Sequence, residues 1–444
     1  MGLSILKIAG SGTGKSLRSI FRSLNSYKVS RTISTLNRSD EDRVSSSSSS
    51  SDDSVFSSSS PLLMLSPSNY IISYAFYSFA KNRVFSIPKP EKTRYAIEIV
   101  GSSHGWLACF NHRRNELFLS NPLSGRRVNL PSICNLNISR YDLKTSSGIN
   151  KIIISCSDPE SEECRAMMLY RASNRLAFCC PGISSSRNKW ITIKSLYSDI
   201  VHCATHKLFY AIKRNSKTDL ELEAWDLRNP LSPTLVWSCG VDKLEYCYDS
   251  GGQSDPAQND VSCFNHQTQY YLVVSQQGEL FLVYRYFYRY MLPDGSCVPY
   301  EDGEEILNSK YPPKTVNYKV YKIVREVDGG KKVYMDGHLD DQVMFVGWLS
   351  NGMAMPAADA DGFQPNTICF TDDTHNIFKE ARGNDNGIYD YKNKTFHPCY
   401  YPCDYESLRR KILPPPLWFI PKLHGNGNGN ENSCKKSKHG QTQK

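Results

Sequence analysis

Short segments that alternate between apolar and polar residues fill most of this chain, and they constrain its fold more than any other feature. Each is rich in β-branched or aromatic residues, as β-strands are. The clearest segments are residues 83–88, 105–110, 116–120, 151–155, 207–212, 220–225, 270–275, 279–284 and 318–323. Helical periodicity is scarce from residue 61 to residue 421. The pattern therefore predicts an all-β domain over residues 61–421.

Turn signals separate these segments. Pairs of Asp or Asn followed by Gly supply the positive φ angles that tight hairpin turns require. Such pairs occur at residues 294–295, 302–303, 328–329, 336–337, 351–352, 361–362 and 386–387. Two strand–turn–strand units can be delimited directly, one with a turn at residues 121–125 and one with a turn at Lys392 and Asn393. The sequence therefore predicts antiparallel strands joined by short connections.

A domain built from so many short strands needs an architecture that protects the strand edges. A β-propeller does so by radial repetition, at roughly 40–50 residues per blade. Residues 61–421 would then form about seven four-stranded blades, with an uncertainty of at least one blade. The internal repeat is loose, because Glu-Leu-Phe-Leu at residues 116–119 recurs at residues 279–282 without a strict motif. Two packed sandwiches or barrels are the alternative.

The charge of the chain is concentrated at its N-terminus. The formal net charge is +9, and residues 1–39 contain seven basic residues and no acidic one. Leu17, Ile20, Phe21 and Leu24 share one face of a potential helix, as in an amphipathic transit peptide. The residues at 31–34 resemble a matrix-protease cleavage site. We therefore expect residues 1–39 to direct the protein to the mitochondrion, with plastid or dual targeting as alternatives.

The rest of the chain adds three expectations. Residues 40–60 are Ser-rich and predict a linker, whereas residues 422–444 predict a disordered tail. Beyond residue 39, basic and acidic residues nearly balance, so nucleic acid is not an expected partner. The apolar runs are too short for a membrane helix, which predicts no membrane insertion. The 15 scattered cysteines are expected to be small buried side chains in a reducing compartment. The domain is expected to be monomeric.

Several segments also resemble a known family. The match is strongest at residues 101–108 and 116–126, and it continues at residues 339–347, 365–373 and 414–421. It extends over residues 60–421, and the chain is similar there to the plant KIB-type β-propeller domain. The resemblance implies a propeller, usually behind an F-box that docks a cullin-type ubiquitin ligase. Residues 1–60 contain no F-box pattern, so the chain resembles the organelle-targeted branch of that family.

The residues that carry the resemblance have expected structural roles. Gly101 and Gly105 bracket a turn in which His104 and the preceding serines can bond to the backbone. Trp106 is expected to pack between blades, and Asn121 to bond the backbone of the turn around Pro122. A ligand-binding role for His104 is the less favoured alternative.

Four groups of residues suggest chemistry without completing a site. Residues 9–16 approximate a phosphate-binding P-loop, but no alternating α/β pattern follows. His202 and His206 have the spacing of a helical zinc site, with Cys203 in place of the usual Glu and a predicted strand after them. Cys399 and Cys403 with His397, and the cluster Asp359, Asp361, Asp372 and Asp373, lack completing ligands. We therefore predict no catalytic, cofactor-binding or metal-binding residue, and no cofactor.

These observations favour a non-enzymatic organellar propeller that acts as a protein-interaction module. They do not reveal which protein it binds or which of its residues form the binding site. Two alternatives stay open. The first is an F-box-type substrate receptor of a cullin ubiquitin ligase, as the resemblance implies. The second is an organellar enzyme with a pocket at the propeller axis.

Overall fold

A computed structural model describes residues 60–422, apart from residues 66–72, 90–96, 137, 139–147, 172–173, 183–188, 194, 217–218, 230–231, 242–266, 289–313, 327–328, 372–384 and 399–415. The chain divides into two compact units, residues 1–53 and 54–444, and all described residues belong to the second. The predicted transit peptide, most of the linker and nearly all of the predicted C-terminal tail lie outside the described residues. No described helix is long and apolar enough to cross a membrane.

The described residues form strands and two short 3-10 helices, Ile133–Leu136 and Ala357–Asp359. Sheet A contains β1 (Leu62–Met64), β2 (Ser73–Ser78), β3 (Arg83–Pro88) and β25 (Leu417–Phe419). Sheet B contains β4 (Ile97–Ser103), β5 (Trp106–Asn111), β6 (Glu116–Ser120) and β7 (Arg127–Asn129). Sheet C contains β8 (Ile149–Ile154), β9 (Ala166–Tyr170), β10 (Arg175–Cys179) and β11 (Ile191–Ile193). Sheet D contains β12 (Tyr197–Cys203), β13 (Leu208–Arg214), β14 (Leu220–Asp226) and β15 (Thr234–Val241).

The remaining strands form a nine-stranded sheet that consists of two groups. The first group is an antiparallel meander of β16 (Gln267–Ser275), β17 (Leu280–Tyr288), β18 (Lys314–Glu326) and β19 (Gly329–Tyr334). The second contains β20 (Gln342–Val346), β21 (Met353–Pro356), β22 (Thr367–Phe370), β23 (Gly387–Asp390) and β24 (Thr395–Pro398). Only two parallel residue pairs, between β16 and β21, join the groups. We therefore treat them as separate blades.

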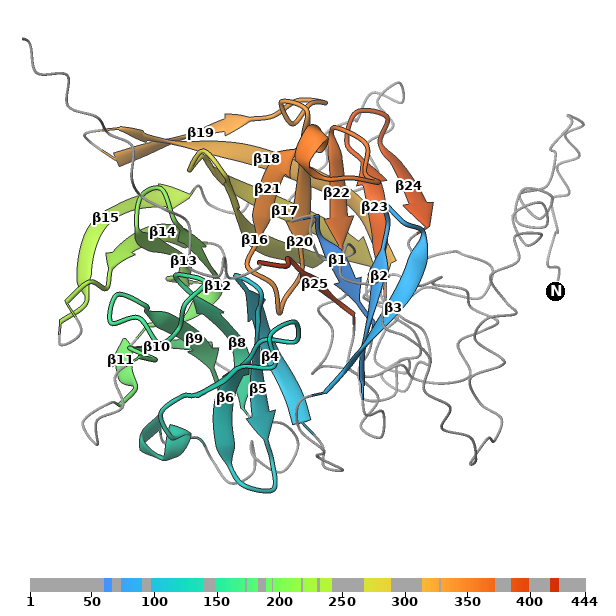
Figure 1. Cartoon of the computed structure of the whole chain (residues 1–444). Helices are drawn as coiled ribbons and strands as arrows, with labels where there is room; N and C mark the ends of the chain where they lie inside the picture. Colours follow the sequence, from blue (N-terminus) through green and yellow to red (C-terminus); the bar gives the residue numbers. More distant parts are fainter. Residues whose placement is uncertain are drawn as a thin grey trace, which may run out of the picture. The chain divides into compact units, whose positions relative to one another are not determined.

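The strand groups are arranged around a common centre (Figure 1). In sheets B, C and D the first strand in the chain lies at one edge of the sheet and each later strand lies further along. These first strands contact one another in sequence, β4 with β8, β8 with β12, and β12 with β16. Sheet A closes the ring, because β25 from the end of the described chain pairs with β1 from its beginning. This pairing joins the two ends of the domain without a covalent link.

The hydrophobic core lies between blades. Six clusters of buried residues occur, and each contains side chains from two neighbouring strand groups. One cluster, for example, joins Trp106 of sheet B to Ile152 and Met168 of sheet C. Another joins Leu63 and Trp418 of sheet A to Phe345 of β20. Because each blade packs on both faces, strands such as β5, β8 and β12 are buried along their whole length.

The predicted all-β propeller fold is confirmed, and each strand predicted from the alternating pattern is present. In the described residues the ring closes with six strand groups and six interblade clusters, one fewer than the approximate expectation of seven. The expectation assumed roughly 40–50 residues per blade, whereas residues 61–421 divide among six strand groups at about 60 residues each. Trp106 and Asn121 have their predicted roles. Trp106 is buried between sheets, and the Asn121 side chain accepts hydrogen bonds from the amides of Leu123 and Ser124.

Candidate interaction surface and axial centre

We call β4, β8, β12 and β16, which contact one another around the ring, the inner strands. Residues 347–352 connect β20 to β21 and bond to three of them; we call these residues the axial segment. The Leu349 carbonyl accepts a hydrogen bond from the amide of Ser102 on β4, at 2.7 Å. The Asn351 side chain accepts one from the amide of His202 on β12, at 3.1 Å. The Gly352 carbonyl accepts one from the amide of Val274 on β16, at 3.2 Å. The axial segment therefore ties three inner strands together with the chain's own backbone and amide groups.

A fourth strand joins the same centre. The Ser350 hydroxyl lies 3.2 Å from both the backbone nitrogen and the carbonyl oxygen of Trp418 on β25. Glycine is required at Gly352, because a Cβ atom there would lie 1.9 Å from the carbonyl oxygen of Leu272. Asn351 and Gly352, which the sequence suggested as a tight turn, thus permit a close approach of two backbones instead. The axial segment therefore bonds to strands of four different strand groups.

Two histidines lie next to the axial segment. His104 occupies the turn between β4 and β5 with a φ of 52°, and its ring centroid is 5.9 Å from that of His202. Burial lowers the pKa of His202 to about 4, and the positive charge of Lys422 contributes. Burial, Lys422 and His202 together lower the pKa of His104 to about 3. Both imidazoles are therefore neutral at physiological pH.

The hydrogen bonding of these rings is incomplete within the described residues. The Lys422 ammonium lies 3.3 Å from Nδ1 of His104 and donates to it. Nε2 of His104 and Nδ1 of His202 are buried without a protein partner there. A buried polar atom without a partner costs free energy unless a water or a polar ligand bonds to it. A ligand that binds His104 could therefore also contact His202. The ligand-binding role of His104 stays a prediction.

A buried ion pair links β8 to two other inner strands, β12 and β16. The Lys151 ammonium on β8 lies 2.6 Å from the Asp199 carboxylate on β12, and both side chains are almost fully buried. The second oxygen of Asp199 accepts a hydrogen bond from the amide of Leu272 on β16, at 2.8 Å. Burial raises the pKa of Asp199, and Lys151 opposes that shift. The pair joins neighbouring blades through charges that have no access to water.

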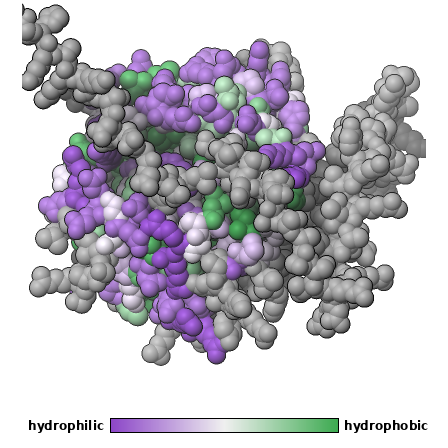
Figure 2. Space-filling model, in the orientation of Figure 1, coloured by the Kyte–Doolittle hydropathy of each residue, from purple (hydrophilic) through white to green (hydrophobic). Residues whose placement is uncertain are grey.

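The outer strands present a different surface. Seven large hydrophobic side chains among the described residues are at least 38% exposed, and five of them belong to β15, β18 and β19. These five are Leu235, Val236, Val324, Val333 and Tyr334. Figure 2 shows hydrophobic residues at the surface over β19, bordered by hydrophilic ones. Exposed apolar side chains that gather on neighbouring elements are typical of interaction sites.

The register of β18 and β19 sorts these side chains by face. Val324 lies opposite Lys331, and Lys322 lies opposite Val333. Directly opposed residues and residues two apart along a strand share a face, so these two valines and two lysines form one surface. We call it the β18–β19 outer face. Lys322 is paired with Glu279 at 2.5 Å. Lys331 and Glu326 are both exposed on this face, so it combines apolar groups with charges of both signs.

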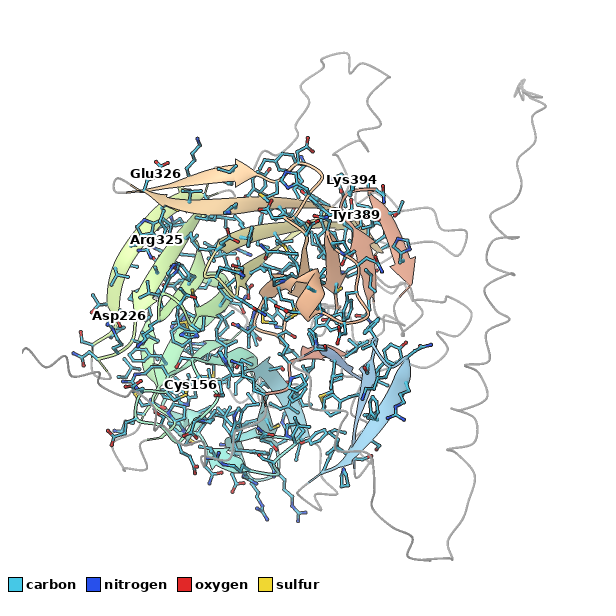
Figure 3. The ribbon with its side chains drawn as sticks, turned by 45° about the horizontal axis from the view of Figure 1, so that its top comes forward. Cys156, Asp226, Arg325, Glu326, Tyr389 and Lys394 are labelled. Atoms are coloured by element: carbon cyan, nitrogen blue, oxygen red, sulfur yellow. The ribbon has the colours of Figure 1, made fainter. Side chains whose placement is uncertain are left out.

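The opposite face of the same hairpin packs on sheet D. Ile323 belongs to the core between the blades, and the Arg325 guanidinium lies 5.3 Å from the ring centre of Trp237 on β15. Arg325 also donates a hydrogen bond to the Tyr210 hydroxyl, at 3.2 Å. The Trp237 indole donates to the Gly329 carbonyl, at 2.9 Å. These contacts hold the hairpin against sheet D and leave its outer face exposed (Figure 3, where Arg325 is labelled).

The structure does not bring the metal-like motifs of the sequence into sites. His202 lies on β12, and His206 follows that strand and pairs with the Tyr210 hydroxyl at 2.8 Å, so the two are not on one helix face. Asp359 lies in a 3-10 helix and Asp361 in the loop after it. The P-loop-like residues 9–16, Cys399, Cys403, Asp372 and Asp373 lie outside the described residues. Within the described part of the chain, no three His, Cys, Asp or Glu side chains gather to hold a metal ion.

The sequence alone does not reveal the axial segment or the outer face. Lys and Val lie two residues apart at 322 and 324 and at 331 and 333, but this pattern gains significance only from the pairing of β18 with β19. The proximity of His104 and His202 had no local signal, since the two lie almost a hundred residues apart.

A closed ring of radially arranged antiparallel sheets defines this domain as a β-propeller. A family model described as the KIB1-4 β-propeller matches residues 76–390, and the chain belongs to that family. A search of curated proteins found no match to this chain.

Three solved structures illustrate the more distant similarity. The β-propeller domain of Cps50 (Swd1) from Myceliophteria thermophila is 8% identical, with 77% of this chain and 86% of that one covered and a TM-score of 0.31. The N-terminal domain of Nup159 is 9% identical, with 80% and 79% covered and a TM-score of 0.29. Hydrazine synthase from Kuenenia stuttgartiensis is 11% identical, with 62% and 65% covered and a TM-score of 0.30.

Proposed function

We propose that this propeller is a non-enzymatic protein-interaction module, and that the β18–β19 outer face is its binding surface. One observation carries the proposal: Val324 and Val333, two of the seven large hydrophobic side chains of the described residues that are at least 38% exposed, lie together on this face. The exposed Lys331 and Glu326 lie on the same face as these valines and define the chemistry of the partner. It is a protein segment that presents apolar side chains together with an acidic and a basic one.

The hairpin suits this role mechanically. Its inner face is fixed to sheet D through Ile323 and Arg325, so the outer face does not need to become ordered when a partner binds. A preorganised surface loses less conformational entropy on association than a flexible one.

A matched set of variants tests the proposal. Tagged wild-type protein, the double variant Val324→Asp/Val333→Asp and the control Val84→Asp are used to capture proteins from the producing cell. Val84 is also a valine on an outer strand and is 42% exposed. We expect the wild type and the Val84 variant to capture the same partner proteins in equal amounts. The double variant should capture at least about tenfold less of these proteins.

Two other results have defined meanings. Equal capture by all three forms would show that the outer face is not the binding surface. Capture of a cullin adaptor by all three would support the ubiquitin-ligase alternative, since that docking depends on an F-box and not on this face.

The proposed location is the mitochondrion, with plastid or dual targeting as alternatives. Support comes from the seven basic residues and the missing acidic residues at positions 1–39. Fractionation of the producing cell, followed by N-terminal sequencing of the recovered protein, tests this. We expect recovery from mitochondria with a new N-terminus near Ser34. Recovery from the cytosol with Met1 or Gly2 retained would contradict it.

A further inference from the structure

Two cysteines face one another in the connection between β8 and β9. The register of these strands pairs Ile154 with Ala166. It continues beyond them, because the amide of Ser155 donates to the Arg165 carbonyl at 2.9 Å and the amide of Arg165 donates to the Ser155 hydroxyl at 2.9 Å. Cys156 and Cys164 come next on the two segments, and continuing the register by one step would set them opposite one another; both belong to the side of the sheet that faces sheet B. Both thiols are free.

This placement meets the geometric requirement for a disulfide. Opposed residues of antiparallel strands have Cα atoms roughly 4.5–5.5 Å apart, and their side chains are on the same face. Disulfides form across Cα separations of roughly 4.4–6.8 Å. Both side chains also lie at one core cluster, with Cys164 inside it and Cys156 packed against it. Bond formation therefore needs little movement of the backbone.

The two thiols differ in reactivity. Cys164 is fully buried in the core between sheets B and C, and Cys156 packs against that core but is partly exposed. The hydrogen bond from the Cys164 thiol, followed by lesser effects of the nearby backbone and Ser155, lowers the pKa of Cys156 to about 7 against the cost of partial burial. Its bond to Cys156 and burial raise the pKa of Cys164. Cys156 is thus the more nucleophilic and the more accessible sulfur.

The loop between these cysteines and Arg165, which follows Cys164, contact two neighbouring blades. Its Ser157 carbonyl accepts a hydrogen bond from the Trp106 indole of sheet B, at 2.8 Å. On the other side, the Arg165 guanidinium donates to the carbonyls of Leu227 and Arg228 beyond β14, each at 2.7 Å. The labelled Cys156 lies in this connection (Figure 3). A covalent change at Cys156 is therefore placed where sheets B, C and D meet.

We propose that Cys156 and Cys164 form a peroxide-responsive dithiol site that closes to a disulfide. The Cys156 thiolate attacks one oxygen of hydrogen peroxide, the O–O bond breaks, and a sulfenic acid forms as hydroxide leaves and takes up a proton. The sulfur of Cys164 then attacks the Cys156 sulfur, the S–O bond breaks, and water leaves with the Cys164 proton. Two thiols and one peroxide give one disulfide and two waters, so the peroxide is the two-electron oxidant.

The test uses the full-length reduced protein and limiting hydrogen peroxide at neutral pH. Differential alkylation and peptide mapping then identify the oxidised cysteines. We expect the peptides of Cys156 and Cys164 to be joined by a disulfide, and Cys156 to be consumed roughly tenfold faster than the exposed Cys134. This measurement needs no substitution. Oxidation at equal rates at Cys134 and Cys156, or no linked peptide, would overturn the proposal.

Three variants assign the roles. Cys164→Ala removes the second sulfur, so a sulfenic acid at Cys156 should persist and be trapped by a dimedone reagent. Cys156→Ser should leave Cys164 unoxidised on the same time scale. Cys134→Ser is the matched control and should form the disulfide at the wild-type rate. Disulfide formation that is lost in the Cys134 variant, or trapping at Cys164 in the Cys156 variant, would contradict the assignment.

Discussion

The inner strand β12 and the outer strand β19 belong to the same ring but have opposite surroundings. Every residue of β12 is buried, whereas no residue of β19 is. Charged side chains follow the same division, since Lys151 at the centre is paired with Asp199 away from water and Lys331 on the outer face is exposed. Stability therefore depends on the centre, and the outer strands can change their side chains for binding without loss of the fold.

The largest expected effect comes from Asp199→Ala at the centre. The substitution leaves the Lys151 ammonium buried without a counter-charge and removes the acceptor for the Leu272 amide. Removing one partner of a buried pair costs about 3–5 kcal/mol. We expect the free energy of unfolding to fall by this amount in denaturant titrations of the full-length protein.

An outer ion pair provides the comparison. Glu116 lies 3.2 Å from Arg127, with side chains 43% and 27% exposed. Glu116→Ala should change the free energy of unfolding by less than about 1 kcal/mol, since water replaces the lost partner. Equal losses for the two variants would mean that the buried pair contributes no more than an exposed one.

The axial histidines predict a second large effect, which depends on pH. Folded His202 has a pKa lowered to about 4, while an unfolded imidazole takes up a proton near pH 6.5. Between these values the unfolded state binds more protons, so stability falls as the pH drops from 6.5 toward 4. The loss at pH 4 from this residue alone should be about 3 kcal/mol.

The variant His202→Phe isolates this contribution from the titration of carboxylates. Its free energy of unfolding should decline less steeply than that of the wild type from pH 6.5 to pH 4, whatever its stability at pH 7. Parallel pH profiles for the two proteins would show that His202 is protonated in the folded state or accessible to water.

Two glycines offer a comparison of intermediate size. Gly352→Ala would place a Cβ atom 1.9 Å from the Leu272 carbonyl oxygen, so the axial segment would have to shift, at a cost of about 1–3 kcal/mol. Gly240 on the outer strand β15 has no atom within 4 Å of the corresponding position. Gly240→Ala should be neutral or stabilising by up to about 1 kcal/mol. Thermal unfolding of both variants tests the difference, and a destabilised Gly240 variant together with an unaffected Gly352 variant would reverse it.

Features with local sequence signals could be predicted, whereas features that depend on contacts between distant residues could not. The strands at residues 83–88 and 116–120 were recognised at their observed bounds, because period-two alternation and turn residues are local signals. The propeller followed from the number of strands and the family resemblance. The number of strand groups was less certain, since the five strands β20–β24 do not follow the four-stranded repeat.

The candidate site was less predictable, because its parts come together only through pairing across the ring. Spacing in the sequence relates His202 to His206, whereas its neighbour in space is His104. Asn351 and Gly352 have a local preference for a tight turn, which the close approach to Leu272 overrides. Cys156 and Cys164 come together only because β8 pairs with β9.

The smallest expected effect on stability belongs to the outer face and decides whether the comparison holds. Val324 and Val333 are 40% and 38% exposed, so Val324→Asp/Val333→Asp should change the free energy of unfolding by no more than about 1 kcal/mol in total. New carboxylates would also lie next to Lys331 and Lys322, which favours the folded variant slightly. If the variant unfolds as the wild type does but captures no partner, the outer face acts in binding alone. If it loses several kcal/mol, the hairpin contributes to the ring itself, and a loss of binding would then report unfolding instead of a broken interface.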